Sequence, residues 1–222
     1  NTTYGSEVIN EGNYEGTGGL IGMPYGALEN LKVSGLHVKG YTYVGGVSGR
    51  INENTNQNIQ VGDENLTTAD GAKVPFGVFV EGRTYISGVA SRSTSGGYST
   101  TVNYFKNVKV QNVRISASND GAYGIGAVCQ VEDSEVSGCD IYAATSHAAG
   151  VVRDWNTVYR TTVKDTKISS GNNVGGIGTY GLSAVDCTVS GCTITGNKYV
   201  GGVLGLSYNS TINSTGVVDS FI

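Results

Sequence analysis

The chain has 222 residues and a formal net charge of −4; only 14% of its residues are charged, and 35 are glycine. This length suffices for one domain with a hydrophobic core, and the weak charge argues against a basic nucleic-acid-binding surface or an acidic tail. Glycine at about twice its usual frequency, interspersed with Val, Thr, Ser, Asn and Tyr, favours short strands and tight turns over helices.

A short glycine word recurs along the chain, first as TGGL and last as VGGV. Its second glycine, taken as an anchor, is spaced by 27, 42, 36, 26, 26 and 26 residues. The seven anchors are Gly19, Gly46, Gly88, Gly124, Gly150, Gly176 and Gly202. The unit is therefore about 26 residues long, and the second and third units carry insertions, which we place at 52–73 and 92–104. We expect each anchor at a corner that requires positive φ or a close backbone approach.

A second word follows in several units, with the pattern apolar, any, apolar, any, any, apolar, any, apolar. It reads LKVSGLHV at 31–38, VKVQNVRI at 108–115 and CTVSGCTI at 187–194, with Thr in two of the apolar positions of TTVKDTKI at 161–168. Alternation on both sides of a two-residue step predicts two short strands joined by a bend, with one face inward. Two further columns, two residues before and one after each anchor, are also predicted to be buried: Val44, Ile86, Val174 and Val200, and Leu20, Val47, Val89, Ile125, Val151, Ile177 and Val203.

A unit of this size cannot bury its inward face alone, but stacked units can. The sequence therefore predicts an all-β fold, a single-stranded parallel β-helix (β-solenoid) of about seven coils, which forms one domain over 1–222. By analogy with parallel crossover connections, we expect right-handed winding.

The four cysteines are Cys129, Cys139, Cys187 and Cys192, and they lack the Cys-x-x-Cys spacing of zinc ribbons. The last three fall on positions of the second word that hold core residues in other units. We therefore predict four unpaired, buried thiols that act as small apolar side chains.

The runs YVGGVLG, YVGGVSG and GGLIG resemble the glycine-rich GLUG motif, which occurs in arrays in large bacterial surface and secreted proteins. The resemblance extends over most of the chain, although AYGIGAV and AAGVVRD depart from its glycine pattern. It implies a bacterial origin, a surface or secreted location, and a structural or adhesive role. The motif has no catalytic residues to carry over.

Parallel β-helices also host polysaccharide lyases and hydrolases, which need acids on neighbouring coils and a Lys or Arg base. The predicted columns lack this arrangement, because Asp140 lies over Lys167 and the EDSE cluster at 132–135 is predicted to be a solvated corner. The two histidines, His37 and His147, are isolated in the sequence. We therefore predict no catalytic residue, no metal site and no cofactor.

Two features suggest ligand binding. The column three residues before the anchors contains Tyr43, Tyr85 and Tyr199, whose rings could pack against sugars or shield the sheet from water. The two insertions are expected to emerge side by side from one edge, where they form a binding face or are merely tolerated loops. The candidate binding residues there are Arg50, Arg92, Tyr98 and Tyr104.

The leading hypothesis is a non-catalytic module of a bacterial cell-surface or secreted protein, an adhesin or rigid spacer whose partner is a glycan or a host or cell-surface protein. The alternative is a polysaccharide lyase or hydrolase, or a phage tail-spike-like domain, and an acidic cleft built from adjacent coils would favour it. The sequence contains no stretch of the ~18 apolar residues that a membrane helix needs. Because the chain starts at Asn1 without a signal-peptide profile, we expect it to be part of a larger chain.

Overall fold

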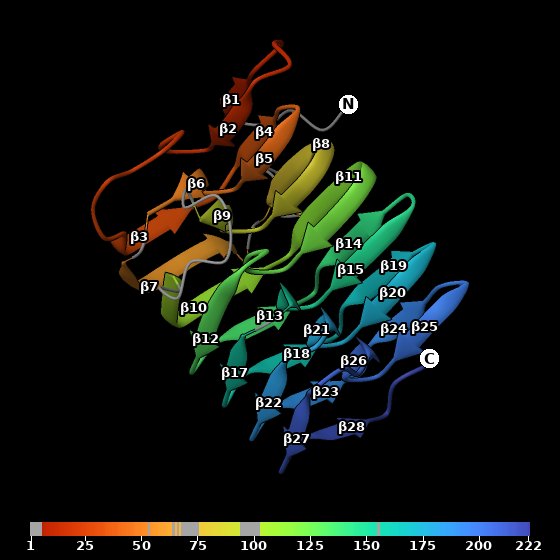
Figure 1. Ribbon diagram of the computed structural model, residues 1–222. Coiled ribbons are helices and arrows are strands. Elements are labelled where there is room, and N and C mark those ends of the chain that lie inside the picture. Colours follow the sequence, from red (N-terminus) through yellow and green to blue (C-terminus); the bar gives the residue numbers. More distant parts are fainter. Residues whose placement is uncertain are drawn as a thin grey trace.

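In the computed structural model, all regular elements of the described residues are β-strands, stacked as parallel rungs of a β-solenoid (Figure 1). The structure describes residues 6–52, 54–63, 65, 67, 76–93, 103–154 and 156–222. Within the regular part, register partners are 26 or 27 residues apart, as in the column Val136, Val163 and Val189. The predicted all-β solenoid of about seven coils is confirmed.

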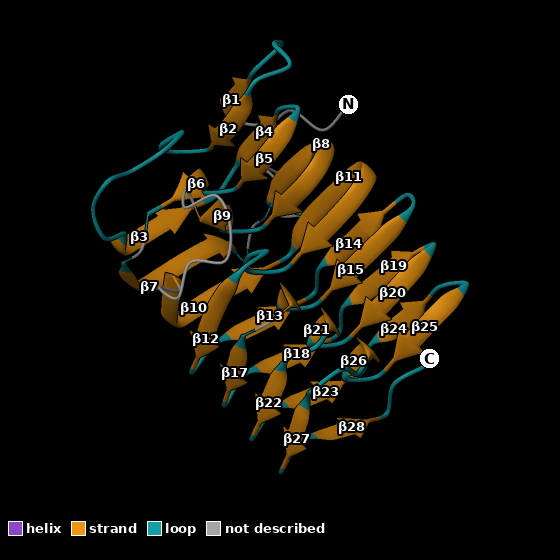
Figure 2. Cartoon of the chain, in the orientation of Figure 1, coloured by secondary structure: helices purple, strands orange, loops and turns teal. Residues whose placement is uncertain are grey.

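Two large sheets and two small ones form the walls of the solenoid (Figure 2). The 12-stranded sheet contains β1 (Ser6–Ile9), β2 (Glu15–Gly18), β4 (Leu36–Lys39), β5 (Thr42–Gly45), β8 (Val78–Ser87), β11 (Val113–Tyr123), β14 (Asp140–Ala143), β15 (Ser146–Ala149), β19 (Lys167–Ser170), β20 (Asn172–Gly175), β24 (Thr193–Thr195) and β25 (Lys198–Gly201). The 11-stranded sheet contains β3 (Glu29–Val33), β7 (Thr55–Gly62), β10 (Asn103–Gln111), β12 (Cys129–Glu132), β13 (Glu135–Ser137), β17 (Thr157–Tyr159), β18 (Thr162–Lys164), β22 (Ser183–Val185), β23 (Thr188–Ser190), β27 (Thr211–Asn213) and β28 (Gly216–Val218). The small sheets are β16 (Val152–Asp154), β21 (Gly178–Tyr180) and β26 (Leu204–Leu206), and β6 (Ser48–Ile51) with β9 (Ala90–Ser93).

The predicted core columns are buried through the middle of the solenoid. Val47, Ile125 and Ile177 are fully buried, as are Val110 and Val189 of the second word. At the ends the prediction fails. Leu20 is 50% exposed, and Val200 and Val203 are only partly buried. Among the described residues these end coils have a neighbouring coil on one side only, so their inward residues lack half of the cover that the middle coils receive.

Six of the seven anchor glycines, all but Gly202, are required by close backbone approach and not by positive φ. A Cβ on Gly124 would lie 1.8 Å from the carbonyl oxygen of Gly150, and one on Gly150 would lie 2.1 Å from that of Gly176. Positive φ occurs instead three residues earlier, for example at Tyr43 (54°) and Tyr85 (57°). Large side chains rarely adopt this conformation, so the fold holds these tyrosines there against their backbone preference.

The residue ranges predicted for the two insertions are both too long. Residues 55–62 form β7, a regular rung in register with β3 and β10, so the extra residues of this coil lie between Gly62 and Val78. In the next coil Arg92 lies in β9 and Tyr104 in β10, which leaves 94–102 as the insertion. The two insertions therefore leave the solenoid at different corners, the first after β7 and the second after β9, and not side by side from one edge.

Three of the four cysteines, Cys139, Cys187 and Cys192, occupy slots of a buried hydrogen-bond ladder. All four are free and buried, as predicted. Cys139 Sγ lies 3.3 Å from the Ser137 carbonyl, and one coil on, Thr166 Oγ1 donates to the Lys164 carbonyl at 2.8 Å. The Thr166 hydroxyl also accepts a hydrogen bond from the Cys139 amide at 3.3 Å. These slots therefore select short side chains with a donor, Cys, Ser or Thr, which is more specific than the predicted role of a small apolar residue.

Because the thiols are buried, we expect none to react with iodoacetamide in the folded protein at pH 8. Burial raises the pKa of Cys139 to about 12 and also raises the pKa of Cys129, so the reactive thiolate is scarce at that pH. Intact-mass analysis should show no adduct before unfolding and four after unfolding in denaturant without reductant. Two adducts or fewer after unfolding would contradict the assignment of free cysteines.

Candidate functional site

The four residues predicted to bind a ligand do not form one site. Arg50 lies in β6, and the backbone of Arg92 in β9 is in register with it. Tyr104 lies in β10 of the 11-stranded sheet, and Tyr98 is outside the described residues. The structure brings the two arginine positions into one column and places Tyr104 on another sheet.

Two rings of the predicted aromatic column stack on each other. The Tyr43 and Tyr85 ring centroids are 5.4 Å apart, with 19° between the ring planes. The Arg50 guanidinium lies 4.7 Å from the Tyr43 centroid, and that of Arg153 lies 5.2 Å from the Tyr85 centroid. Tyr43 is only 6% exposed. Guanidiniums of the chain itself lie over these rings, so shielding of the sheet is the better interpretation of this part of the column.

The same column continues as a ladder of polar side chains. His147 Nδ1 lies 2.8 Å from Asp120 Oδ1, and its Nε2 lies 3.0 Å from Asn173 Nδ2. Both ring nitrogens of His147 thus lie within hydrogen-bond distance of a polar side chain from another coil. The sequence indicated that His147 is isolated; in the structure it has partners at both ring nitrogens.

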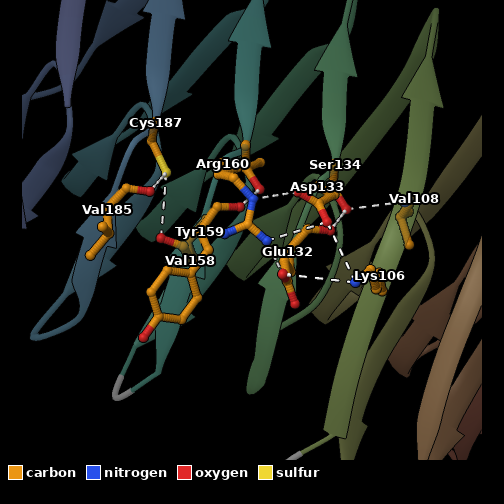
Figure 3. A network of polar contacts seen from close by, with 11 residues as sticks. Lys106, Val108, Glu132, Asp133, Ser134, Val158, Tyr159, Arg160, Val185 and Cys187 are labelled. Atoms are coloured by element: carbon orange, nitrogen blue, oxygen red, sulfur yellow. Dashed lines mark hydrogen bonds and ion pairs between the residues drawn. The ribbon is translucent and has the colours of Figure 1, made fainter. Parts of the chain in front are cut away.

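The acidic EDSE corner is an ion-pair network and not a merely solvated turn (Figure 3). Arg160 Nε lies 2.6 Å from Asp133 Oδ1, and the same guanidinium pairs with Glu132. From the other side, Lys106 Nζ lies 3.6 Å from Asp133 Oδ2. Lys164 pairs with Glu135 at 3.1 Å, so cations from the two neighbouring coils neutralise all three carboxylates of this corner, which gives it a structural role.

A groove runs across the outer face of the 12-stranded sheet, where β4, β8 and β11 lie side by side. It consists of two hollows that share Glu81 and Ser116, and we call it the β8 groove. Its aromatic side chains are Phe79 and Tyr41. Its ionisable side chains are His37, Lys39, Glu81, Arg83 and Arg114.

Strand alternation places these side chains in the groove. In β4 the residues Leu36 and Val38 point into the core, so His37 and Lys39 face outward. In β8, Val78 and Val80 are fully buried, which turns the intervening Phe79 outward. Register aligns His37, Phe79 and Arg114 as neighbours on successive coils.

Glu81 sits at the centre of the groove and is held by two partners. Its carboxylate lies 3.1 Å from Lys39 Nζ and 3.3 Å from His37 Nε2. Burial alone would raise the pKa of Glu81, but the hydrogen bond and charge of Lys39, together with His37, lower it below its ordinary value. Glu81 is therefore ionised at neutral pH.

The walls of the groove carry aromatic edges and guanidiniums. The Phe79 ring meets Phe76 edge-on, with centroids 5.9 Å apart, and Phe76 stands at the end of the first insertion. The Arg83 guanidinium lies 5.3 Å from the Tyr41 ring centroid and also contacts the Tyr41 hydroxyl. Arg114 Nε lies 3.8 Å from Asp140 Oδ2, beyond hydrogen-bond distance, and its side chain is 53% exposed.

Sequence reasoning missed this groove because it sought binding residues in the insertions. The signal was present in the outward positions of the second word: His37 in LKVSGLHV and Arg114 in VKVQNVRI occupy the same column. Phe79 was hidden, because the first insertion separates the two halves of the word in that coil.

No family model, curated protein or solved structure matches this chain. In the part of the chain that the structure describes, no helix is long and apolar enough to cross a membrane. Among the same residues, no group of three or more His, Cys, Asp or Glu side chains is placed to hold a metal ion.

Proposed function

We propose that this chain is a non-catalytic repeat module of a bacterial cell-surface or secreted protein, and that it binds a glycan in the β8 groove. The observation that carries the proposal is the groove itself, in which aromatic edges from Phe79 and Tyr41 alternate with charged hydrogen-bonding groups. Sugars present apolar ring faces and polar hydroxyls, and a concave site with both kinds of group suits them.

The solenoid supports this role because it holds the groove rigidly. Neighbouring rungs are about 4.8 Å apart, so side chains on successive coils follow one another along the axis at a constant interval. A linear polymer lying along the axis would meet a preformed row of contacts, and preorganisation lowers the entropy cost of binding.

Two carboxylates support a binding role over a catalytic one. A general acid in a glycosidase has a raised pKa, whereas that of Glu81 is lowered. Burial alone would raise the pKa of Glu135, but hydrogen bonds with Ser137 and Lys164 lower it. Neither group is protonated at neutral pH, which disfavours the alternative of a polysaccharide hydrolase built on them.

The surface location rests on the glycine words. YVGGVLG and YVGGVSG resemble GLUG repeats, and the anchor glycines of both are in close contact with neighbouring coils or side chains. A glycan ligand would be met outside the cell, and a repeat built of stacked coils also serves as a spacer.

Replacing Phe79 with alanine is expected to weaken glycan binding about tenfold, because the ring offers the groove an apolar contact surface. Ligands would first be sought on a glycan array with the native protein, and affinities would then be measured by titration calorimetry. Tyr25, an aromatic residue that is 77% exposed and not a lining residue of the groove, provides the control Tyr25→Ala. Equal affinities for the native protein and the folded Phe79→Ala variant would place the site elsewhere.

A further inference from the structure

We infer that the ligand of the β8 groove is an acidic glycan, whose sugar carboxylates are held by Arg114 and Arg83. This inference rests on the proposed function and names its ligand class. Three cationic side chains line the groove, Lys39, Arg83 and Arg114, against the single carboxylate of Glu81. Two further carboxylates lie at its rim, Glu7 beside His37 and Asp140 beside Arg114, so the lining is cationic although its rim is not.

The charges of the groove divide into two groups. Lys39 and His37 both contact Glu81, so the positive charge of Lys39 is already balanced within the groove. The guanidiniums of Arg83 and Arg114 do not contact Glu81 and form the second group. Arg83 is exposed and contacts the neutral Tyr41, and Arg114 lies 3.8 Å from its neighbouring carboxylate, Asp140.

Guanidinium is suited to a carboxylate ligand, because its planar fork binds both oxygens at once. Arg114 is in register with Phe79, so about 4.8 Å separates their backbones along the axis. One sugar unit could therefore place its ring against Phe79 and its carboxylate against Arg114. Arg83 lies four residues further along β8 and provides a second guanidinium in the groove.

The test uses three polyuronates, polygalacturonate, alginate and hyaluronan, each paired with its carboxyl-reduced form. Reduction keeps the sugar backbone and removes the charge. At least one acidic polymer is expected to bind with an affinity about tenfold or more above that of its reduced form. This is the gain in affinity that hydrogen bonds to a charged group usually provide. The double variant Arg83→Gln, Arg114→Gln should remove this preference, and Arg114→Lys, which keeps the charge but loses the fork, should reduce it.

Lys109→Gln is the matched control, because Lys109 is exposed on β10 of the other large sheet. It should leave the preference unchanged. Equal binding of acidic and reduced forms, abolished by Phe79→Ala, would overturn the inference while the proposed function stands. Binding to poly-L-glutamate as tight as to the polyuronates would also overturn it, since charge alone would then suffice. No binding to any glycan of the array would overturn both.

Discussion

Replacing Gly150 with alanine is expected to lower the free energy of unfolding by about 3 kcal/mol or more, the upper range for an overpacked core. The added Cβ would lie 2.1 Å from the Gly176 carbonyl oxygen and 2.8 Å from a Val163 methyl carbon. Relief would require the two coils to separate, which would stretch the hydrogen bond from the Gly150 amide to the Gly175 carbonyl, now 3.3 Å. Urea unfolding followed by circular dichroism would measure the loss.

The matched control is Gly216→Ala in β28, where an added Cβ has no atom within 4 Å. Its free energy of unfolding should change by less than about 0.5 kcal/mol, because a surface substitution away from special features has little effect. If the two variants were equally stable, the anchor glycines would not be explained by close approach of the coils.

The repeat made the architecture predictable from the sequence. Identical coils stacked in register must place identical residues over one another, so the spacing of Gly124, Gly150 and Gly176 gives the number of residues per coil directly. The inward columns followed from the same logic. The exposure of the end coils was not predictable in this way, because the burial of Leu20 depends on a neighbouring coil that the glycine word cannot indicate.

The limits of the insertions were not predictable from contiguous words. In the coil of β7 and β8, the two halves of the second word are separated at the bend, after Gly62 (φ 82°), whose register position is next to that of Gly35 (φ 63°) one coil earlier. A bend already occupied by a left-handed residue can accept extra chain without disturbing the rungs on either side.

The bends between strands are marked by a residue type that the sequence analysis did not use. Asp133, Asp165 and Asp186 all have positive φ and each precedes a Ser, Thr or Cys slot of the buried ladder. Asp and Asn are the side chains that best tolerate this conformation after glycine, so their recurrence before these slots marks the bends. Tyr43 and Tyr85 could not be recognised in this way, since tyrosine rarely has positive φ.

The β8 groove was only partly predictable, because it depends on which outward residues three successive coils bring together. Register fixes His37, Phe79 and Arg114 as one row, but the sequence aligned only the first and third. The hydrogen-bonded state of Glu81 depends on side-chain geometry across coils, which no word pattern specifies.

Replacing Val189 with aspartate is expected to destabilise the protein by at least about 3 kcal/mol at pH 7, because it buries a charge without a partner. Val189 is fully buried between its column neighbours Val163 and Val217, and Val163 is itself fully buried. The loss would be measured as the shift in the urea midpoint relative to the native protein. Val189→Ala serves as the control, since it removes volume but adds no charge.

The two variants should respond differently to pH. A buried carboxyl has a folded-state pKa raised above its unfolded value of about 3.9, so its penalty grows as pH rises from the unfolded towards the folded pKa. The stability gap between Val189→Asp and the native protein should therefore narrow from pH 7 to pH 4, while that of Val189→Ala stays constant. A gap for Val189→Asp that is equally large at both pH values, or absent at pH 7, would show that this column is not the closed apolar core on which the stacking of the coils depends.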